Sequence, residues 1–268
     1  MVQGRNEIKA LLDAHGIRPK RSLGQNFLAD PNLVDRIVRT AGVGAGDLVV
    51  EVGAGTGTLT RALAATGASV VAYEVDERLL PVLDEVLAGT NVELRAEDVT
   101  RLDLAECFAE GPWTMVANLP YNVGTPLVLD TLRHAPSVTR LIVMVQREVA
   151  ERFVAVPGSK AYGVPSIVSS LHADTRLAFT VPPGVFFPIP EVDSAVVEIN
   201  RKPAPAAAER AIEIAAIAFQ QRRKMLRRSL ASLADNVGDV LAAAGIDETA
   251  RPEDLAAEEF VRLAGVLP

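Results

Sequence analysis

The chain has 268 residues, 49% hydrophobic and 23% charged, which suits one large globular domain or one domain with a small addition. A single cysteine, Cys107, excludes a disulfide framework, and with only three scattered histidines we expect no metal site. No apolar run approaches ~18 residues, and the N-terminus lacks the apolar core of a signal peptide. We therefore predict a cytoplasmic protein without a membrane partner.

The net charge of −7 argues against a nucleic-acid partner only until its distribution is considered. Residues 1–28 carry five basic and two acidic side chains, whereas residues 229–268 carry eight acidic and two basic ones. Five positive charges fall within residues 222–228: Arg222, Arg223, Lys224, Arg227 and Arg228. A locally basic face can bind phosphates, because the attraction acts within about 8–10 Å. From charge alone, a solvated helix face fits equally well.

Strand and helix patterns alternate from residue 31 to residue 145. Asp30 and Pro31 form an N-cap followed by proline, which predicts a helix start. The expected helices span 31–41, 58–65, 77–87 and 126–133, and the expected strands 48–52, 68–74, 92–95, 115–117 and 141–145. This alternation predicts an α/β fold with a parallel, doubly wound sheet. Residues 176–181 and 192–200 lack a long helix between them and predict an antiparallel hairpin at the sheet edge.

The best linker candidate is Lys202-Pro203-Ala204-Pro205. After it the pattern is helical, with a helix over 206–219, a basic helix through Leu233 and short helices to Val266. We therefore predict a sheet domain over residues 1–201 and a small all-helical domain over residues 202–268.

Three predicted strands each end on a group suited to one part of an adenosine. Residues 51–57 read Glu-Val-Gly-Ala-Gly-Thr-Gly, and glycines at such a strand end let the backbone approach a ligand closely. Glu74, 21 residues beyond Gly53, ends the second strand, where a carboxylate can accept both hydroxyls of a ribose. Asp98 follows the third strand, where it could accept from an adenine amino group. These residues leave NAD and S-adenosylmethionine both open as cofactors.

The tetrapeptide Asn118-Leu119-Pro120-Tyr121 favours S-adenosylmethionine. It follows the fourth strand, beside the reacting end of such a cofactor. The Asn118 side-chain oxygen and the Leu119 carbonyl could accept from the two N–H groups of an aromatic amine. Pro120 would stiffen the turn, and Tyr121 would stack on the base. Positioning and electrostatics could then carry methyl transfer without a metal or a strong general base.

This tetrapeptide after the glycine motif resembles the adenine-N6 methyltransferases of ribosomal RNA, a family with a Rossmann-like seven-stranded sheet. The resemblance covers almost the whole chain and favours the small-subunit (16S) rRNA adenine dimethyltransferases. It rests further on residues 23–28, 146–152, 159–163, 186–194 and 221–230. Residues 186–194 match the family pattern F-x-P-x-P-x-V-x-S.

The resemblance implies roles for individual residues. Asn26 and Leu28 would hold the methionine end of the cofactor and Gly53 would lie along it. Glu74 would take the ribose, Asp98 the adenine, and Asn118 would face both cofactor and target. Phe186 would sandwich the target adenine against Tyr121, although Phe187 is a second candidate. The basic residues from Arg222 to Arg228 would bind RNA.

We therefore expect dimethylation of N6 on two adjacent adenosines near the 3′ end of 16S rRNA, in the immature small ribosomal subunit, by a monomer. Each target base must leave its stack, which costs a few kcal/mol, and stacking on aromatic side chains would offset this. A large-subunit (23S) rRNA methyltransferase conferring macrolide resistance shares two of the motifs and is the nearest alternative. A ribosome-assembly factor whose methylation is secondary is the other.

Overall fold

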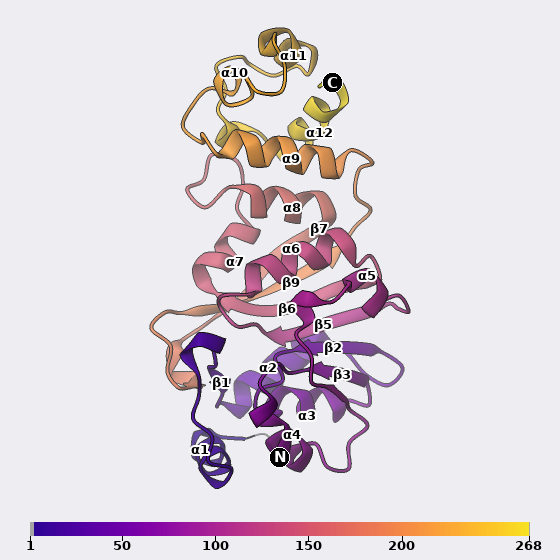
Figure 1. Ribbon diagram of the computed structural model, residues 1–268, viewed down its shortest axis with the longest axis vertical. Coiled ribbons are helices and arrows are strands. Elements are labelled where there is room, and N and C mark those ends of the chain that lie inside the picture. The colour runs from indigo at the N-terminus through magenta and orange to yellow at the C-terminus, as the bar shows by residue number, and fades with distance from the viewer. Residues whose placement is uncertain (1–2, 268) are drawn as a thin grey trace. The chain divides into compact units, whose positions relative to one another are not determined.

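Figure 1 shows a computed structural model, in which residues 3–267 are described. Its main feature is a seven-stranded sheet with the strand order β4-β3-β2-β5-β6-β9-β7. The strands are β2 (Leu48–Val52), β3 (Ser69–Tyr73), β4 (Glu93–Arg95), β5 (Trp113–Asn118), β6 (Val138–Gln146), β7 (Ala173–Val181) and β9 (Ser194–Arg201). The central pairs are parallel, and β9 is antiparallel to β6. The predicted α/β fold with a mostly parallel sheet is confirmed, and the two late strands lie at one edge.

Helices lie between the strands, and four of them, near residues 31–41, 58–65, 77–87 and 126–133, occupy the predicted segments, whereas those near residues 5–14, 104–107 and 147–153 were not predicted. The first part of the chain contains α1 (Arg5–Ala14), α2 (Pro31–Ala41), α3 (Thr58–Ala64), α4 (Leu80–Val86), α5 (Leu104–Cys107), α6 (Gly124–His134) and α7 (Arg147–Phe153). The start of α2 follows the predicted chemistry, because the Asp30 side chain accepts from the Asn32 and Leu33 amides. One core cluster joins Val34 of α2 and Leu63 of α3 to strand residues such as Val116, and these side chains are fully buried.

A second, two-stranded sheet was not predicted. Strand β1 (Phe27–Leu28) pairs antiparallel with β8 (Phe186–Phe187), so that Phe27 lies opposite Phe187 and Leu28 opposite Phe186. The pairing brings together two of the motif segments, 23–28 and 186–194, that are far apart in sequence. Two residues per strand are too few to give a recognisable period-2 pattern.

The chain forms two compact units. One runs to Ala150 and includes Arg176–Asn200, and the other comprises Glu151–Thr175 and the chain from Arg201 onward. Unit boundaries thus fall next to the predicted linker, but residues 151–175, which we placed in the sheet domain, group with the C-terminal helices. The reason lies in α8 (Val164–His172), which packs against α9 (Ala208–Phe219). The second unit also contains α10 (Leu226–Ser229), α11 (Val237–Ala243) and α12 (Ala257–Val266).

The basic stretch does not form the continuous helix that we predicted. Helix α9 ends at Phe219, residues beyond it form turns, and Met225 is extended (φ −60°, ψ 146°) before the four-residue α10. The break has an electrostatic rationale, since like charges one helical turn apart destabilise a helix. Within the described residues, no helix has both the length and the apolar character needed to cross a bilayer.

Candidate active site

The glycine motif forms a tight loop at the carboxyl end of β2. Gly53 and Gly55 have φ values of +81° and +59°, which residues other than glycine rarely adopt. A Cβ atom on Gly55 would lie 3.0 Å from a ring carbon of Phe27. The loop is fixed to the next strand because the Gly53 amide donates to the Tyr73 carbonyl (2.9 Å). Both glycines border a cavity at this strand end, as the motif predicts.

Glu74 follows β3 and faces this loop. Its Oε2 accepts from the Gly55 amide (2.7 Å) and its Oε1 from the Asp76 amide (2.9 Å). The side chain is only 5% exposed, and burial, the largest influence, raises the pKa of Glu74. Because each carboxylate oxygen has further acceptor capacity beyond one amide, both remain able to accept from a ligand.

Three neighbouring cavities meet at Gly53. The central one is lined by Asn26, Glu74, Asn118 and Tyr121, among others. A second is lined by Leu28, Glu51 and Asn118, and a third by Asp98, Tyr73 and Val99. All six residues predicted to bind the cofactor thus line one of three cavities that share Gly53.

The residues of these cavities fit S-adenosylmethionine. The exposed Val75 lines both the central cavity and the one beside Asp98, which gives an adenine ring an apolar surface next to an acceptor. At the other end, Oε2 of the buried Glu51 has no hydrogen-bond partner among the described residues. An unpaired buried acceptor suits a cationic amino group such as that of the methionine moiety. Burial raises the pKa of Glu51 to about 8, with Glu74 adding to the shift and Thr60 opposing it.

Asn118 is the last residue of β5, and its side chain is hydrogen-bonded to the N-terminal segment at Asn26. Its Nδ2 donates to the Asn26 carbonyl (2.9 Å). This contact orients the amide and leaves Oδ1 as the acceptor for an incoming amino group. Leu119 is buried with its amide bonded to the Met144 carbonyl (3.1 Å), and the Pro120 carbonyl accepts from the amides that begin α6. The tetrapeptide is therefore a fixed turn.

Tyr121 borders the central cavity with part of its ring exposed. Its hydroxyl lies 2.8 Å from Oγ of the fully buried Ser194, and burial raises the pKa of Tyr121. Ser194 is the serine of the F-x-P-x-P-x-V-x-S pattern. Sequence reasoning missed its part in holding Tyr121, as it missed Glu51 and Val75.

Phe186, for which we predicted a stacking role, lies in the core of this structure. Phe186 is 1% exposed and belongs to the same core cluster as Leu28, its partner in the β1–β8 pairing. None of the cavities described above is lined by it. This burial could not be predicted, because the register of the β1–β8 pairing cannot be read from sequence. Stacking by Phe186 stays a prediction. Phe187 is partly exposed and packs beside Phe27.

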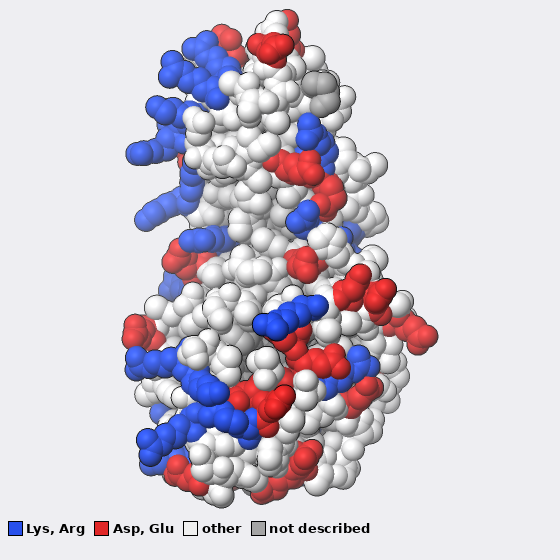
Figure 2. All heavy atoms as spheres, in the orientation of Figure 1, with Lys and Arg blue, Asp and Glu red and all other residues white. Residues whose placement is uncertain are grey.

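The five basic side chains at positions 222–228 fall into two kinds. Arg222 is engaged within the protein: its Nε donates to Glu253 (2.6 Å), and Nη1 and Nη2 donate to the Lys160 (2.9 Å) and Ser159 (3.1 Å) carbonyls. The others are exposed and have no partner in the described part of the chain: Arg223, Lys224, Arg227 and Arg228. Figure 2 shows Lys and Arg side chains gathered on the second unit near the end that carries α10.

The sheet, the glycine loop and the strand-end carboxylates define a class I methyltransferase, whose cofactor is S-adenosylmethionine. The profile of the ribosomal RNA adenine dimethylase family matches residues 16–267. The chain belongs to this family. Within residues 3–267, no group of three or more His, Cys, Asp or Glu side chains is arranged to hold a metal ion.

Relatives agree over almost the full length. "Ribosomal RNA small subunit methyltransferase A" of Kineococcus radiotolerans is 44% identical, covering 98% of this chain and 90% of the relative. The protein of the same name from Dinoroseobacter shibae is 45% identical, covering 98% and 97%. Among solved structures, the 23S rRNA methyltransferase ErmE is 27% identical with a TM-score of 0.69, covering 90% of this chain and 99% of that one. A dimethyladenosine transferase from Plasmodium falciparum (22% identical, TM-score 0.73, covering 90% and 99%) shares the fold.

Proposed function

We propose that the chain dimethylates N6 of two adjacent adenosines near the 3′ end of 16S rRNA, in the immature small ribosomal subunit. The observation that carries the proposal is the meeting of Asn118, Tyr121 and Glu74 around one cavity, in a chain whose small-subunit relatives are 44–45% identical. A protein with this substrate would act in the cytoplasm, as a monomer.

In this mechanism Asn26, Leu28, Gly53, Glu74 and Asp98 hold the cofactor along the three cavities. S-adenosylmethionine supplies an electrophilic methyl group. Asn118 Oδ1 and the Leu119 carbonyl accept from the adenine amino group and direct its lone pair, and Tyr121 stacks on the base. Because the groups are fixed before the substrate arrives, most of the rate enhancement comes from positioning and electrostatics.

The experiment is transfer of tritiated methyl groups to immature small subunits and to large subunits, followed by nucleoside analysis. We expect N6,N6-dimethyladenosine in the small subunit. Product on large subunits alone would support the second candidate, a 23S enzyme, to which the 27% identity with ErmE gives some weight. Tight binding to small subunits without methylation would support the assembly factor. The exposed side chains of Arg223, Lys224, Arg227 and Arg228 favour that alternative.

A further inference from the structure

The segment from Arg18 to Asn26 separates two cavities. Gly24, Gln25 and Asn26 line the central cofactor cavity and also another cavity of about 450 Å³. The latter is lined further by Arg21, Tyr121 and the Pro188–Glu191 loop. It combines the proposed base platform with a cation, so RNA would approach from this side. The same three residues would thus touch both ligands.

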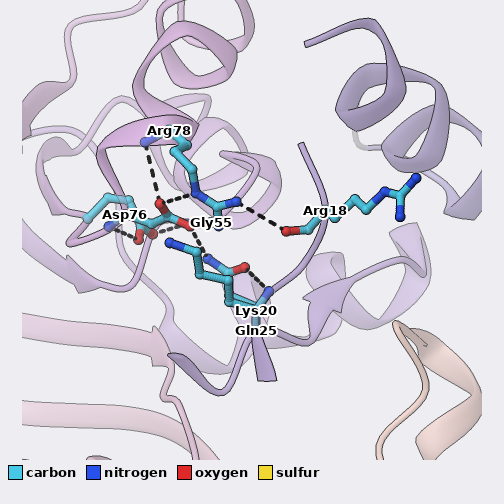
Figure 3. Close-up of polar contacts among 7 residues, drawn as sticks. Arg18, Lys20, Gln25, Gly55, Asp76 and Arg78 are labelled. Carbon is cyan, nitrogen blue, oxygen red and sulfur yellow. Dashed lines mark hydrogen bonds and ion pairs between the residues drawn. The ribbon is translucent and has the colours of Figure 1, made fainter. Parts of the chain in front are cut away.

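A buried carboxylate holds this segment (Figure 3). Asp76 is 5% exposed, and its Oδ2 accepts from Gln25 Nε2 (2.7 Å), while Gln25 Oε1 accepts from the Lys20 amide (2.7 Å). Arg78 Nε donates to Asp76 Oδ1 (2.8 Å), and its Nη1 donates to the Arg18 carbonyl (3.4 Å). The Arg78 guanidinium is also the main reason that the pKa of Asp76 lies below its usual range.

The backbone of Asp76 is also hydrogen-bonded to a residue of the proposed cofactor site. The Asp76 amide donates to Oε1 of Glu74 (2.9 Å), the group proposed to take the ribose. At the far end of the segment, Asn118 Nδ2 donates to the Asn26 carbonyl. A continuous set of contacts therefore leads from Glu74 through Asp76, Gln25 and Arg78 to the backbone of Arg18 and Lys20, next to Arg21 in the chain.

We propose that Asp76 and Arg78 are positioning residues that couple cofactor binding to RNA binding through the segment 18–26. The inference rests on the proposed function. A cofactor held by Glu74 and Asn26 orders the segment 18–26. RNA that contacts Arg21 and Tyr121 then binds a segment that is already ordered. By linkage, RNA then raises cofactor affinity by the same factor.

The decisive variant is Arg78→Gln, because Arg78 lines none of the four cavities described. Arg61→Gln is the matched control, since Arg61 also donates to a backbone carbonyl (Val86, 2.7 Å) and lines none of them. The affinity of the full-length protein for an RNA hairpin from the 3′ end of 16S rRNA is measured with and without S-adenosylhomocysteine. We expect at least about five-fold coupling in the wild type and in Arg61→Gln, and less than two-fold in Arg78→Gln. Equal coupling in all three proteins, or none in the wild type, overturns the proposal.

A second readout needs no RNA and so separates this inference from the proposed function. S-adenosylhomocysteine should slow amide hydrogen exchange across residues 18–26 in the wild type, and should do so much less in Arg78→Gln and in Asp76→Asn. Asp76→Asn keeps an acceptor for the Arg78 amide while removing the charge. Protection unchanged in both variants contradicts the positioning role, whatever RNA the enzyme methylates.

Discussion

The strand ends of the sheet and the basic stretch of the helical unit both hold charged groups proposed to bind ligands, yet they differ in how these are held. Glu74 and Glu51 are almost completely buried, and both oxygens of Glu74 already accept from backbone amides. Arg223 and Arg228 are exposed without partners in the described residues.

The difference separates two kinds of recognition. A buried, pre-bonded carboxylate pays its desolvation cost during folding and can discriminate a ribose hydroxyl by geometry. An exposed arginine gains from phosphates mainly by releasing counterions, so its contribution is strong at low salt and weakly directional. The four predictions below test this contrast, from the largest expected effect to the smallest.

The largest effect is expected from Glu74→Ala. Hydrogen bonds to a charged group are worth about 1.5–3 kcal/mol each, so the loss of two should cost roughly 3–6 kcal/mol, or about two to four orders of magnitude in S-adenosylmethionine affinity. Calorimetry measures this, with the exposed Glu77→Ala as control. Co-sedimentation with small subunits should stay within a few-fold of wild type. If the Glu74→Ala variant binds the cofactor with an affinity within three-fold of wild type, Glu74 does not contact the ribose.

The second prediction concerns Glu51 and pH. Its pKa is raised from 4.5 to about 8, so the folded protein keeps a proton that the unfolded chain releases, and stability falls as pH rises through this window. One proton gives a slope of at most about 1.4 kcal/mol per pH unit, or at most about 5 kcal/mol over the whole window. Glu51→Gln cannot titrate, so its unfolding free energy should vary less between pH 5 and 8. Urea titrations compare the two proteins, and parallel pH curves would contradict the assignment.

The strand-end residues could be predicted because topology constrains them. Parallel strands bring their carboxyl ends to one edge, so Glu74, Asp98 and Asn118 meet whatever the details of packing. The contact between Gln25 and Asp76 could not be predicted, because it joins side chains 51 residues apart. The burial of Phe186 could not be predicted for the same reason, because it depends on a two-residue pairing between distant segments. Arg222 is indistinguishable in sequence from its neighbours, and only the fold directs it to Glu253.

The third prediction concerns the base platform. Tyr121→Ala should lower methyl transfer about ten- to a hundred-fold, because base–aromatic stacking is worth about 1–3 kcal/mol. Cofactor affinity should change only a few-fold. Tyr121→Phe keeps the ring but loses the bond to Ser194, so we expect a loss of only a few-fold, matched by Ser194→Ala and not increased further in the double variant. Abolished cofactor binding with intact RNA binding would assign Tyr121 to the other ligand.

The smallest effects are expected in the basic residues 222–228, where Arg222 should behave differently from the exposed arginines. Each phosphate contact contributes about 0.7–0.9 to the slope of log affinity against log salt, so replacing Arg223, Arg227 and Arg228 with Gln should flatten subunit binding by about 2 to 3 in slope. Arg222→Gln should leave the slope unchanged, because its guanidinium already bonds Glu253 and two carbonyls.

The same substitution at Arg222 should instead lower the free energy of unfolding by about 1–2 kcal/mol, since it leaves hydrogen-bond acceptors unpaired. Salt titrations of subunit binding and thermal denaturation of both variants separate the two roles. A slope reduced by Arg222→Gln as much as by one of the exposed arginines would mean that Arg222 exchanges its internal partners for phosphate when RNA binds. An unchanged slope in the triple variant would make the exposed residues a solvated surface.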